Sequence, residues 1–402
     1  MLRAFAAVAG FFIVACGPPT QQAAPCNGDG DCQLEAGGRC LASPLGSNAC
    51  AYPDGSCPGG YHWGDLTGAI AGQCVESVDA GVDAPDASVD SPDAPIDGPP
   101  IACSGLRIAF DDGQGANRPD PYVAALDGSQ RQPLAPAAGL DYAVTGSTAG
   151  TVAFASDRDG NLEIYRVNAD GSGLINLTMN AAPDGNPVYS RGGAFLAFAR
   201  SGALWTMTSA GASPQAVAAG NAYTPRWSPD DARLVFELWN GSVEADLWIV
   251  NRDGSGLRPL TSAAGTEAYA SWSPDGSRIA FQAGRDIFII NADGTGQVNL
   301  TNDALEQYAP AWSPDGTRIA FAESGDIKTM GPAGGTRTPL SSGPGVDALP
   351  LWSPDGTKIA FARTDAAGTR RDLVVANADG SAPSVFSGPA NYVNSYAWVV
   401  CP

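Results

Sequence analysis

Histidine and lysine are nearly missing from this chain of 402 residues, and each absence argues against particular catalytic sites or binding partners. His62 is the only histidine, so the sequence cannot supply a Ser–His–Asp triad or a histidine-rich zinc site outside its first quarter. Lysine occurs only as Lys328 and Lys358, and the formal net charge is −20. Nucleic acid demands a basic face, so we do not expect it as a partner.

Long hydrophobic runs and amphipathic helical patterns are also missing after residue 15. Residues 4–15 are apolar and follow Arg3, and twelve residues are too few to span a bilayer but suit a signal peptide. The segment ends Ile13-Val14-Ala15-Cys16, which resembles a lipoprotein signal. The resemblance implies cleavage before Cys16 and a lipid on its thiol, with residues 16–25 as a tether. Ordinary secretion with cleavage elsewhere is the alternative.

Such a lipid predicts the location of the protein. Several acyl chains on one residue anchor stably where a single chain binds marginally. We therefore expect an exported, membrane-anchored lipoprotein of the bacterial cell envelope, on the periplasmic or the outer-membrane face.

Six cysteines lie in a short module, residues 26–77, and an even number in an exported segment predicts three disulfides. They are Cys26, Cys32, Cys40, Cys50, Cys57 and Cys74. Aliphatic residues are few here, so the bridges have to replace a hydrophobic core. Fifteen connectivities are open. A metal site is the rival interpretation, but there is no Cys-x-x-Cys pair, so we expect neither a metal nor another cofactor.

Residues 78–102 have the composition of a disordered linker. Aspartates recur every three or four residues among Ala, Val, Ser and Pro, without Lys or Arg, at Asp79, Asp83, Asp86, Asp90, Asp93 and Asp97. Like charges and prolines keep such a segment extended and solvated. A calcium-binding array is the alternative, but the spacing lacks the Gly and Glu of a calcium loop.

The remainder is organised around the phrase Trp-Ser-Pro-Asp-Gly, followed three residues later by Ile-Ala-Phe. It occupies residues 272–281, 312–321 and 352–361, and recurs at 227–236 with Asp231 in place of Gly. The phenylalanine of this motif also recurs earlier in the chain. The full set is Phe110, Phe154, Phe198, Phe236, Phe281, Phe321 and Phe361. The spacings of 38 to 45 residues are those of four-stranded propeller blades.

One unit illustrates the expected blade. Residues 269–272, 278–281, 286–290 and 297–301 are aromatic-rich or β-branched runs suited to strands. Residues 273–276 and 291–294 supply the Pro, Asp, Asn and Gly of tight turns. One such unit cannot bury both faces, whereas a closed ring buries each face and protects the edges. We therefore predict an all-β fold with seven blades, in which Thr145 and Tyr189 replace Trp in the second and third blades.

The first blade lacks a first strand of its own, and residues 395–400 are expected to supply it from the C-terminus. Cys401 and Cys103 fall on adjacent positions of one turn of the blade template, which predicts a disulfide that locks the ring. In the chain-entropy model a loop of this length contributes ~5 kcal/mol. Two unrelated free thiols are the alternative.

These phrases resemble the Pro-Asp-type propeller repeat of the TolB family and of prolyl-oligopeptidase-like and tricorn-like proteases, over residues 103–402. The resemblance implies the fold and says little of function, because one fold hosts many functions. The peptidases of this kind also need an α/β-hydrolase domain, and the sequence holds no Gly-x-Ser-x-Gly elbow.

The loops that lead into the first strands gather at one mouth of a propeller channel. Carboxylates and tyrosines recur there, at Asp141, Asp184, Glu267, Glu306 and Asp347, and at Tyr142, Tyr223, Tyr269 and Tyr308. An acidic, aromatic-edged mouth would suit a cationic ligand or a basic peptide. Solvated loop carboxylates and packed tyrosines are the alternative.

Oxygen-bearing residues also cluster in residues 157–163, where calcium and a plain turn are both possible.

The function we expect is a monomeric, non-catalytic envelope platform that binds a protein, peptide or ligand. A lyase or hydrolase acting on glycan or peptide through carboxylates at the mouth is the alternative, and two carboxylates about 5–9 Å apart would favour it. A structural envelope component is the third.

Overall fold

The computed structural model describes residues 39–42, 48–53, 61–63, 104–113, 119–136, 139–239, 244–263, 265–386 and 392–401. The chain divides into two compact units, Met1–Val89 and Asp90–Pro402. In the first unit, β1 (Arg39–Ala42), β2 (Asn48–Pro53) and β3 (Tyr61–Trp63) form one antiparallel sheet. The signal peptide, Cys16, the linker and four of the six cysteines of residues 26–77 lie outside what the structure describes. Cys40 of β1 and Cys50 of β2 are register partners, but their side chains are not described, so the disulfides stay predictions.

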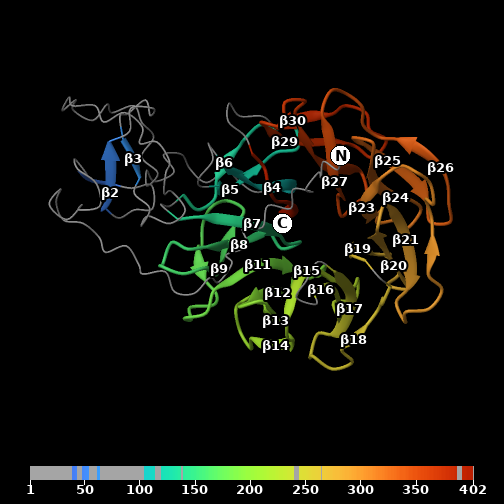
Figure 1. Cartoon of the computed structure of the whole chain (residues 1–402), viewed down its shortest axis with the longest axis horizontal. Coiled ribbons are helices and arrows are strands. Elements are labelled where there is room, and N and C mark those ends of the chain that lie inside the picture. Colours follow the sequence, from blue (N-terminus) through green and yellow to red (C-terminus); the bar gives the residue numbers. More distant parts are fainter. Residues whose placement is uncertain are drawn as a thin grey trace. The chain divides into compact units, whose positions relative to one another are not determined.

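The second unit contains seven four-stranded antiparallel sheets arranged around a common axis (Figure 1). Blade 1 consists of β31 (Tyr396–Cys401), β4 (Gly105–Gly113), β5 (Pro119–Ala124) and β6 (Gln132–Pro133). Blade 2 consists of β7 (Asp141–Gly146), β8 (Thr151–Ser156), β9 (Glu163–Asn168) and β10 (Ile175–Asn176). Blade 3 consists of β11 (Asp184–Tyr189), β12 (Phe195–Arg200), β13 (Ala203–Thr208) and β14 (Gln215–Ala218).

The remaining blades repeat this order. Blade 4 consists of β15 (Asn221–Trp227), β16 (Arg233–Trp239), β17 (Ala245–Asn251) and β18 (Arg258–Pro259). Blade 5 consists of β19 (Glu267–Trp272), β20 (Arg278–Ala283), β21 (Asp286–Asn291) and β22 (Val298–Asn299). Blade 6 consists of β23 (Gln307–Trp312), β24 (Ile319–Glu323), β25 (Asp326–Gly331) and β26 (Gly334–Pro339). Blade 7 consists of β27 (Val346–Trp352), β28 (Lys358–Thr364), β29 (Arg371–Asn377) and β30 (Ser384–Phe386).

The prediction of an all-β, seven-bladed propeller is therefore confirmed. Within the described residues there is no helix, and hence none long and apolar enough to cross a membrane.

The repeated turn explains why each blade folds back on itself. In blade 5, Asp275 accepts hydrogen bonds from the Ser273 hydroxyl at 2.6 Å and from the Ser277 backbone N–H at 3.0 Å. Gly276 closes the turn with φ +68°, a left-handed conformation that favours glycine. These hydrogen bonds favour the carboxylate and lower the pKa of Asp275 to about 2. The same turn recurs around Asp315 and Asp355.

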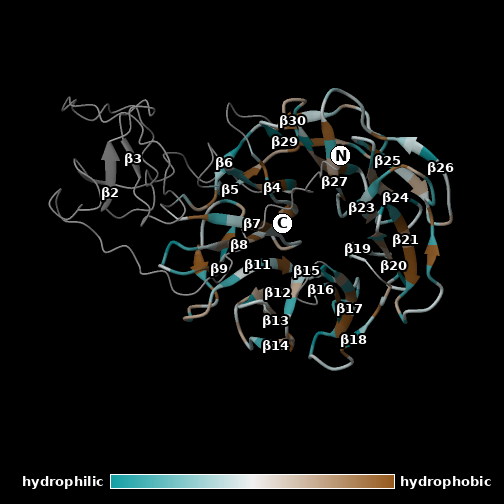
Figure 2. Cartoon of the chain, in the orientation of Figure 1, coloured by the Kyte–Doolittle hydropathy of each residue, from teal (hydrophilic) through white to brown (hydrophobic). Residues whose placement is uncertain are grey.

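The hydrophobic core lies between neighbouring blades rather than within one. All seven of the repeating phenylalanines are at most 1% exposed. Trp272 of blade 5 packs in one cluster with Val235 and Leu247 of blade 4. Its indole N–H also donates to the Arg226 carbonyl of blade 4 at 3.0 Å. Brown, apolar segments accordingly run through the strands of every blade in Figure 2.

The C-terminal strand closes the ring, as the sequence predicts. In β31, Trp398 pairs with Ile108 of β4, and Cys401 pairs with Gly105. The Trp398 indole N–H donates to the Leu351 carbonyl of blade 7 at 3.2 Å, which joins the last blade to the first. Cys401 is in a disulfide. Cys103 lies outside the described residues, so its pairing with Cys401 stays a prediction.

One position differs from the sequence-based alignment. The residue aligned with Trp in blade 2 is Gly146 rather than Thr145, because the turn that follows is one residue shorter. A Cβ at Gly146 would lie 2.2 Å from the Trp398 carbonyl oxygen, so only glycine fits where blade 1 approaches. In blade 3, Tyr189 does occupy the Trp position.

Candidate functional site

The first strands of the blades, which we call the inner strands, are β31, β7, β11, β15, β19, β23 and β27. They lie around the axis and follow one another in contact around the ring. All begin at the same end of the ring, which we call the mouth end. Six carry a β-bulge near their start, with a positive φ at Ala143, Asn186, Thr224, Tyr269, Ala309 and Leu349. Bulges re-aim side chains, and they recur next to functional sites.

Four of the five predicted carboxylates lie at the start of inner strands and are buried. Asp141, Asp184, Glu267 and Asp347 are all at most 2% exposed. Glu306 differs, because it is exposed and the adjacent Gln307 takes the buried position in blade 6. The four carboxylates are therefore held inside the mouth end rather than displayed on it.

Three of them are neutralised by an arginine from the same blade. Arg200 donates two hydrogen bonds to Asp184, each of 2.7 Å. Arg363 contacts Asp347 in the same two-pronged way, at 2.6 and 2.7 Å. Arg158 donates to Asp141 at 2.7 Å while its guanidinium lies 4.9 Å from the centre of the Tyr165 ring. Such forked pairs are among the strongest charge-assisted contacts in proteins.

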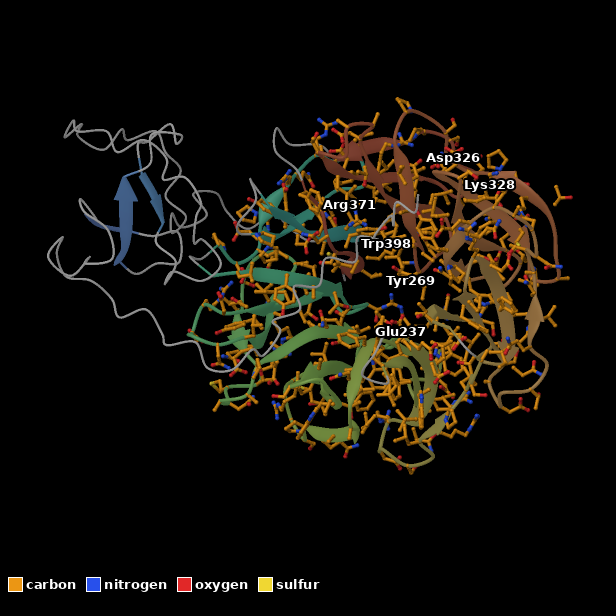
Figure 3. All side chains as sticks on the ribbon, in the orientation of Figure 1. Glu237, Tyr269, Asp326, Lys328, Arg371 and Trp398 are labelled. Carbon is orange, nitrogen blue, oxygen red and sulfur yellow. The ribbon has the colours of Figure 1, made fainter. Side chains whose placement is uncertain are left out.

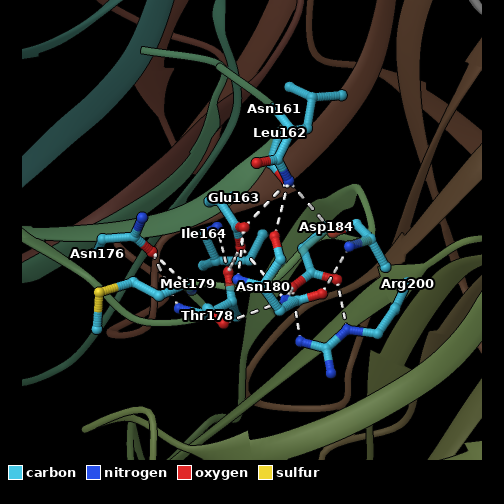
Figure 4. A network of polar contacts seen from close by, with 11 residues as sticks. Asn161, Leu162, Glu163, Ile164, Asn176, Thr178, Met179, Asn180, Asp184 and Arg200 are labelled. Carbon is cyan, nitrogen blue, oxygen red and sulfur yellow. Dashed lines mark hydrogen bonds and ion pairs between the residues drawn. The ribbon is translucent and has the colours of Figure 1, made fainter. Parts of the chain in front are cut away.

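A further buried carboxylate ties blade 2 to blade 3 (Figure 4). Glu163 begins β9 and accepts hydrogen bonds from the Asn180 backbone N–H at 2.8 Å and from the Asn161 side chain at 3.0 Å. The Asn180 side chain in turn donates to Asp184 at 2.8 Å. Arg200, Asp184, Asn180 and Glu163 thus form one continuous network, and it holds the inner strand β11 in place.

Glu267 occupies the same position as Asp184 but has no arginine, because Ala283 stands where Arg200 stands in blade 3. Its neighbours are the Thr261 hydroxyl at 3.1 Å and the carboxyls of Asp246 and Glu244. Burial, reinforced by these two acidic residues, raises the pKa of Glu267 to about 7. Glu267 therefore binds a proton at a higher pH than an ordinary glutamate does.

The predicted tyrosines lie on the inner strands of four blades, and each is half-buried. Burial raises the pKa values of Tyr142, Tyr269 and Tyr308, so these phenols remain protonated hydrogen-bond donors. Tyr223 packs edge-on against Trp239, with ring centres 6.3 Å apart. Each tyrosine therefore leaves part of its side chain, which combines an aromatic ring with a hydroxyl, exposed to solvent at the mouth end.

Two arginines at the axis were not among the sequence-based candidates. Arg226 is exposed on the inner strand β15, where blades 5, 6 and 7 have Ser271, Ala311 and Leu351. Arg371 begins β29 of blade 7. A lone charge among small or apolar residues at one repeat position is the signal that could have identified Arg226. Figure 3 places Arg371, Tyr269 and Glu237, from three blades, around the middle of the ring.

The oxygen-rich segment at residues 157–163 forms a turn whose side chains bond within the protein. Asp157 accepts from the Leu140 backbone N–H, Asp159 from the Tyr165 hydroxyl, and Asn161 donates to Glu163. Among the described residues no group of three or more Asp, Glu, His or Cys side chains is placed to hold a metal ion.

Comparison with known proteins identifies the repeat. Residues 204–400 match the family model of the TolB β-propeller domain. No curated protein matches the chain.

Solved structures share the fold at low identity. TolB from Acinetobacter baumannii is 17% identical, with a TM-score of 0.51 over 74% of this chain and 67% of its own. An oligogalacturonate lyase from Vibrio parahaemolyticus is 16% identical, with a TM-score of 0.54 over 70% of this chain and 86% of its own. A puromycin hydrolase is 16% identical, with a TM-score of 0.58 over 72% of this chain but only 53% of its own.

Proposed function

Because this chain carries a TolB-like β-propeller, we propose that it is a lipid-anchored envelope protein whose propeller binds a protein, peptide or other ligand at the mouth end. The observation that carries the proposal is the set of half-buried tyrosines that four bulged inner strands present around one axis. Aromatic side chains of this kind dominate binding surfaces, because they bury a large area while offering a polar group.

The rigidity of this surface also supports binding. Asp184 and Asp347, each paired with an arginine, fix the start of β11 and β27, which contact the tyrosine-bearing strands β7 and β23. A surface that is already ordered loses little conformational entropy when a partner arrives. A basic partner stays an expectation from the sequence. Glu306 is the exposed carboxylate of the predicted set that would meet it.

An enzyme is the second candidate, and one observation favours it. Glu267 and Asp246 are neighbouring carboxyls, and a pKa of about 7 is the value that a general acid–base group needs at neutral pH. An oligogalacturonate lyase shares this fold over 86% of its own chain, which makes catalysis by such a propeller a candidate here. Binding is the better-supported reading, because Glu267 is 2% exposed and already hydrogen-bonded to Thr261.

Crosslinking in native cells tests the binding function. The full-length protein is recovered from the crosslinked envelope, and its partners are compared with those of a Tyr269→Ala, Tyr308→Ala variant. Val298→Ala, Val385→Ala serves as the matched control, because both valines are exposed on outer strands. Loss of a partner only in the tyrosine variant supports the proposal. Equal recovery from all three proteins would instead favour a structural envelope component.

The lipid anchor has its own test. Intact-mass analysis of the mature protein should show a chain that begins at an acylated Cys16. An unmodified Cys16 would end that part of the proposal and leave ordinary secretion.

A further inference from the structure

Met179 is the most exposed large apolar side chain among the described residues, at 78%. It lies in the loop that joins β10 of blade 2 to β11 of blade 3, at the mouth end. The other two described methionines, Met207 of β13 and Met330 of β25, are each 2% exposed and lie in the hydrophobic core. The described part of the propeller therefore holds one thioether in water and two that the packed blades cover.

The backbone on both sides of Met179 is fixed by hydrogen bonds. The Asn176 side-chain oxygen accepts the Thr178 N–H at 3.0 Å and the Met179 N–H at 3.2 Å. The N–H of Asn180 donates to the buried Glu163 at 2.8 Å. Figure 4 shows these contacts, with the yellow sulfur of Met179 at the end of a side chain that takes no part in them. The thioether is thus displayed on an ordered turn.

Blade 5 contains the same turn with a different residue at its tip. There the Asn299 side-chain oxygen accepts the Thr301 N–H at 2.9 Å and the Asn302 N–H at 3.0 Å. Asn302 has φ +35°, and Met179 has φ +22°. Asparagine adopts positive φ several-fold more readily than most residues, and methionine has no such preference. Neither the turn geometry nor core packing therefore accounts for a methionine at residue 179.

The reactivity of the thioether is what distinguishes methionine from the asparagine of blade 5. Two-electron oxidants convert it to the sulfoxide. With hydrogen peroxide, a sulfur lone pair attacks one peroxide oxygen, the O–O bond breaks, and the other oxygen leaves as water after a proton transfer. The sulfur loses two electrons and the peroxide gains them. Buried methionines react only when the structure around them opens, so exposure sets the order of reaction.

The position of the sulfur also decides what its oxidation does to the fold. A sulfoxide oxygen in a packed core leaves a polar group without a partner, which destabilises the protein. At Met179 the new oxygen meets water. The hydrogen bonds of the turn involve the backbone of Met179 and the side chains of Asn176 and Glu163, and none involves the sulfur. Oxidation there leaves those contacts in place.

We propose that Met179 is a reversible oxidation site, at which peroxides modify the folded propeller without unfolding it. This inference is independent of the proposed binding function. A thiol-dependent reductase reverses the step, because two thiols form a disulfide and the sulfoxide oxygen leaves as water. The exposed loop gives such an enzyme access that the buried positions of Met207 and Met330 deny it.

Peptide mapping by mass spectrometry tests the proposal on the full-length protein. The folded protein is treated with hydrogen peroxide, quenched at intervals with free methionine and digested. The same reaction in concentrated urea gives the reactivity of each methionine without structure. Met179→Leu is the test variant, and Met330→Leu is the matched control that removes a buried thioether instead.

In the folded protein, Met179 should be oxidised roughly ten-fold or more faster than Met207 and Met330, whereas in urea all three should react at similar rates. Wild-type protein oxidised at Met179 should keep its urea-unfolding midpoint. A mixture of the two methionine sulfoxide reductases with dithiothreitol should restore its original mass. The propeller peptides of Met179→Leu should gain no oxygen over the same time, while those of Met330→Leu should gain it as the wild type does.

Three results would overturn the inference. Equal oxidation of Met207 or Met330 in the folded protein would show that exposure does not select Met179. A lowered unfolding midpoint after oxidation of Met179 alone would mean that the modification damages the fold. A sulfoxide at residue 179 that both reductases leave unchanged would show that the modification is not reversible.

Discussion

Asp184 and Glu267 occupy the same position in two blades, and we predict that removing their charge has opposite effects on stability. Asp184 faces Arg200, whereas Glu267 faces Asp246 and Glu244. The substitutions Asp184→Asn and Glu267→Gln change shape very little. Blade 6 already carries Gln307 at this position, fully buried, so the fold accepts an amide there.

The magnitude for Glu267 follows from its pKa. A rise from the ordinary 4.5 to about 7 is worth about 3 kcal/mol at 1.36 kcal/mol per unit. Water around the exposed Glu244 screens part of this, so we expect about 1–2 kcal/mol. The folded state binds the proton more tightly than the unfolded chain. Its contribution is therefore complete below pH 4.5 and is lost as the pH rises through 7.

Glu267→Gln should thus stabilise the propeller by about 1–2 kcal/mol at pH 8 and by almost nothing at pH 4.5. Asp184→Asn leaves the Arg200 guanidinium, whose side chain is 17% exposed, without its carboxylate. Breaking one side of such a buried pair costs about 2–4 kcal/mol at pH 7 to 8. Urea unfolding of the full-length proteins, followed by tryptophan fluorescence at pH 4.5 and 8, measures both.

The reasoning fails if Glu267→Gln is destabilising at pH 8 by as much as at pH 4.5. That result would mean that Glu267 is ionised and paired in the folded protein. It also fails if the two variants shift the pH 8 midpoint in the same direction.

Three further predictions concern the ring itself. Gly146→Ala should destabilise the protein by about 1–3 kcal/mol more than Gly331→Ala in thermal unfolding, because a Cβ clashes with the Trp398 carbonyl at the first site and makes only an ordinary 3.8 Å contact with the Gly334 carbonyl at the second; equal losses would contradict that clash. Cys401→Ser should lower the free energy of unfolding by up to about 5 kcal/mol, and reductant should lower the stability of the wild type but not of the variant. Peptide mapping of the unreduced protein should recover Cys401 linked to Cys103, and another partner would refute the predicted pair. Phe281→Ala should cost about 3–5 kcal/mol in urea unfolding, because it opens a cavity between blades 4 and 5, and a loss below 1 kcal/mol would mean that the neighbours refill it.

The repeat phrase predicted the strands well because it encodes local chemistry. The Ser273-to-Arg278 turn and the buried Phe281 depend on neighbours a few residues away, so sequence alone identifies them. The sequence also identified the carboxylates at the starts of the inner strands, but it did not predict that they are buried. A clue was present, since Arg200 follows Asp184 and Arg363 follows Asp347 at the same separation of 16 residues.

Contacts that depend on ring closure could not be read in this way. The shorter turn of blade 2 moved the Trp position from Thr145 to Gly146, and a fixed template overlooks such a change. The backbone N–H of Tyr269 in blade 5 donates to Glu237 of blade 4, and this contact depends on how the two blades lie around the axis. No spacing in the chain predicts it.

The composition of blade 1 has a consequence for folding. Its inner strand, β31, is the last propeller strand in the chain, while β4 to β6 are the first. Until β31 pairs with it, β4 keeps an unpaired edge to which strands of other chains can pair. A circular permutant that places β31 directly before β4 would form blade 1 as one local hairpin sheet, and should refold faster and aggregate less than the natural order.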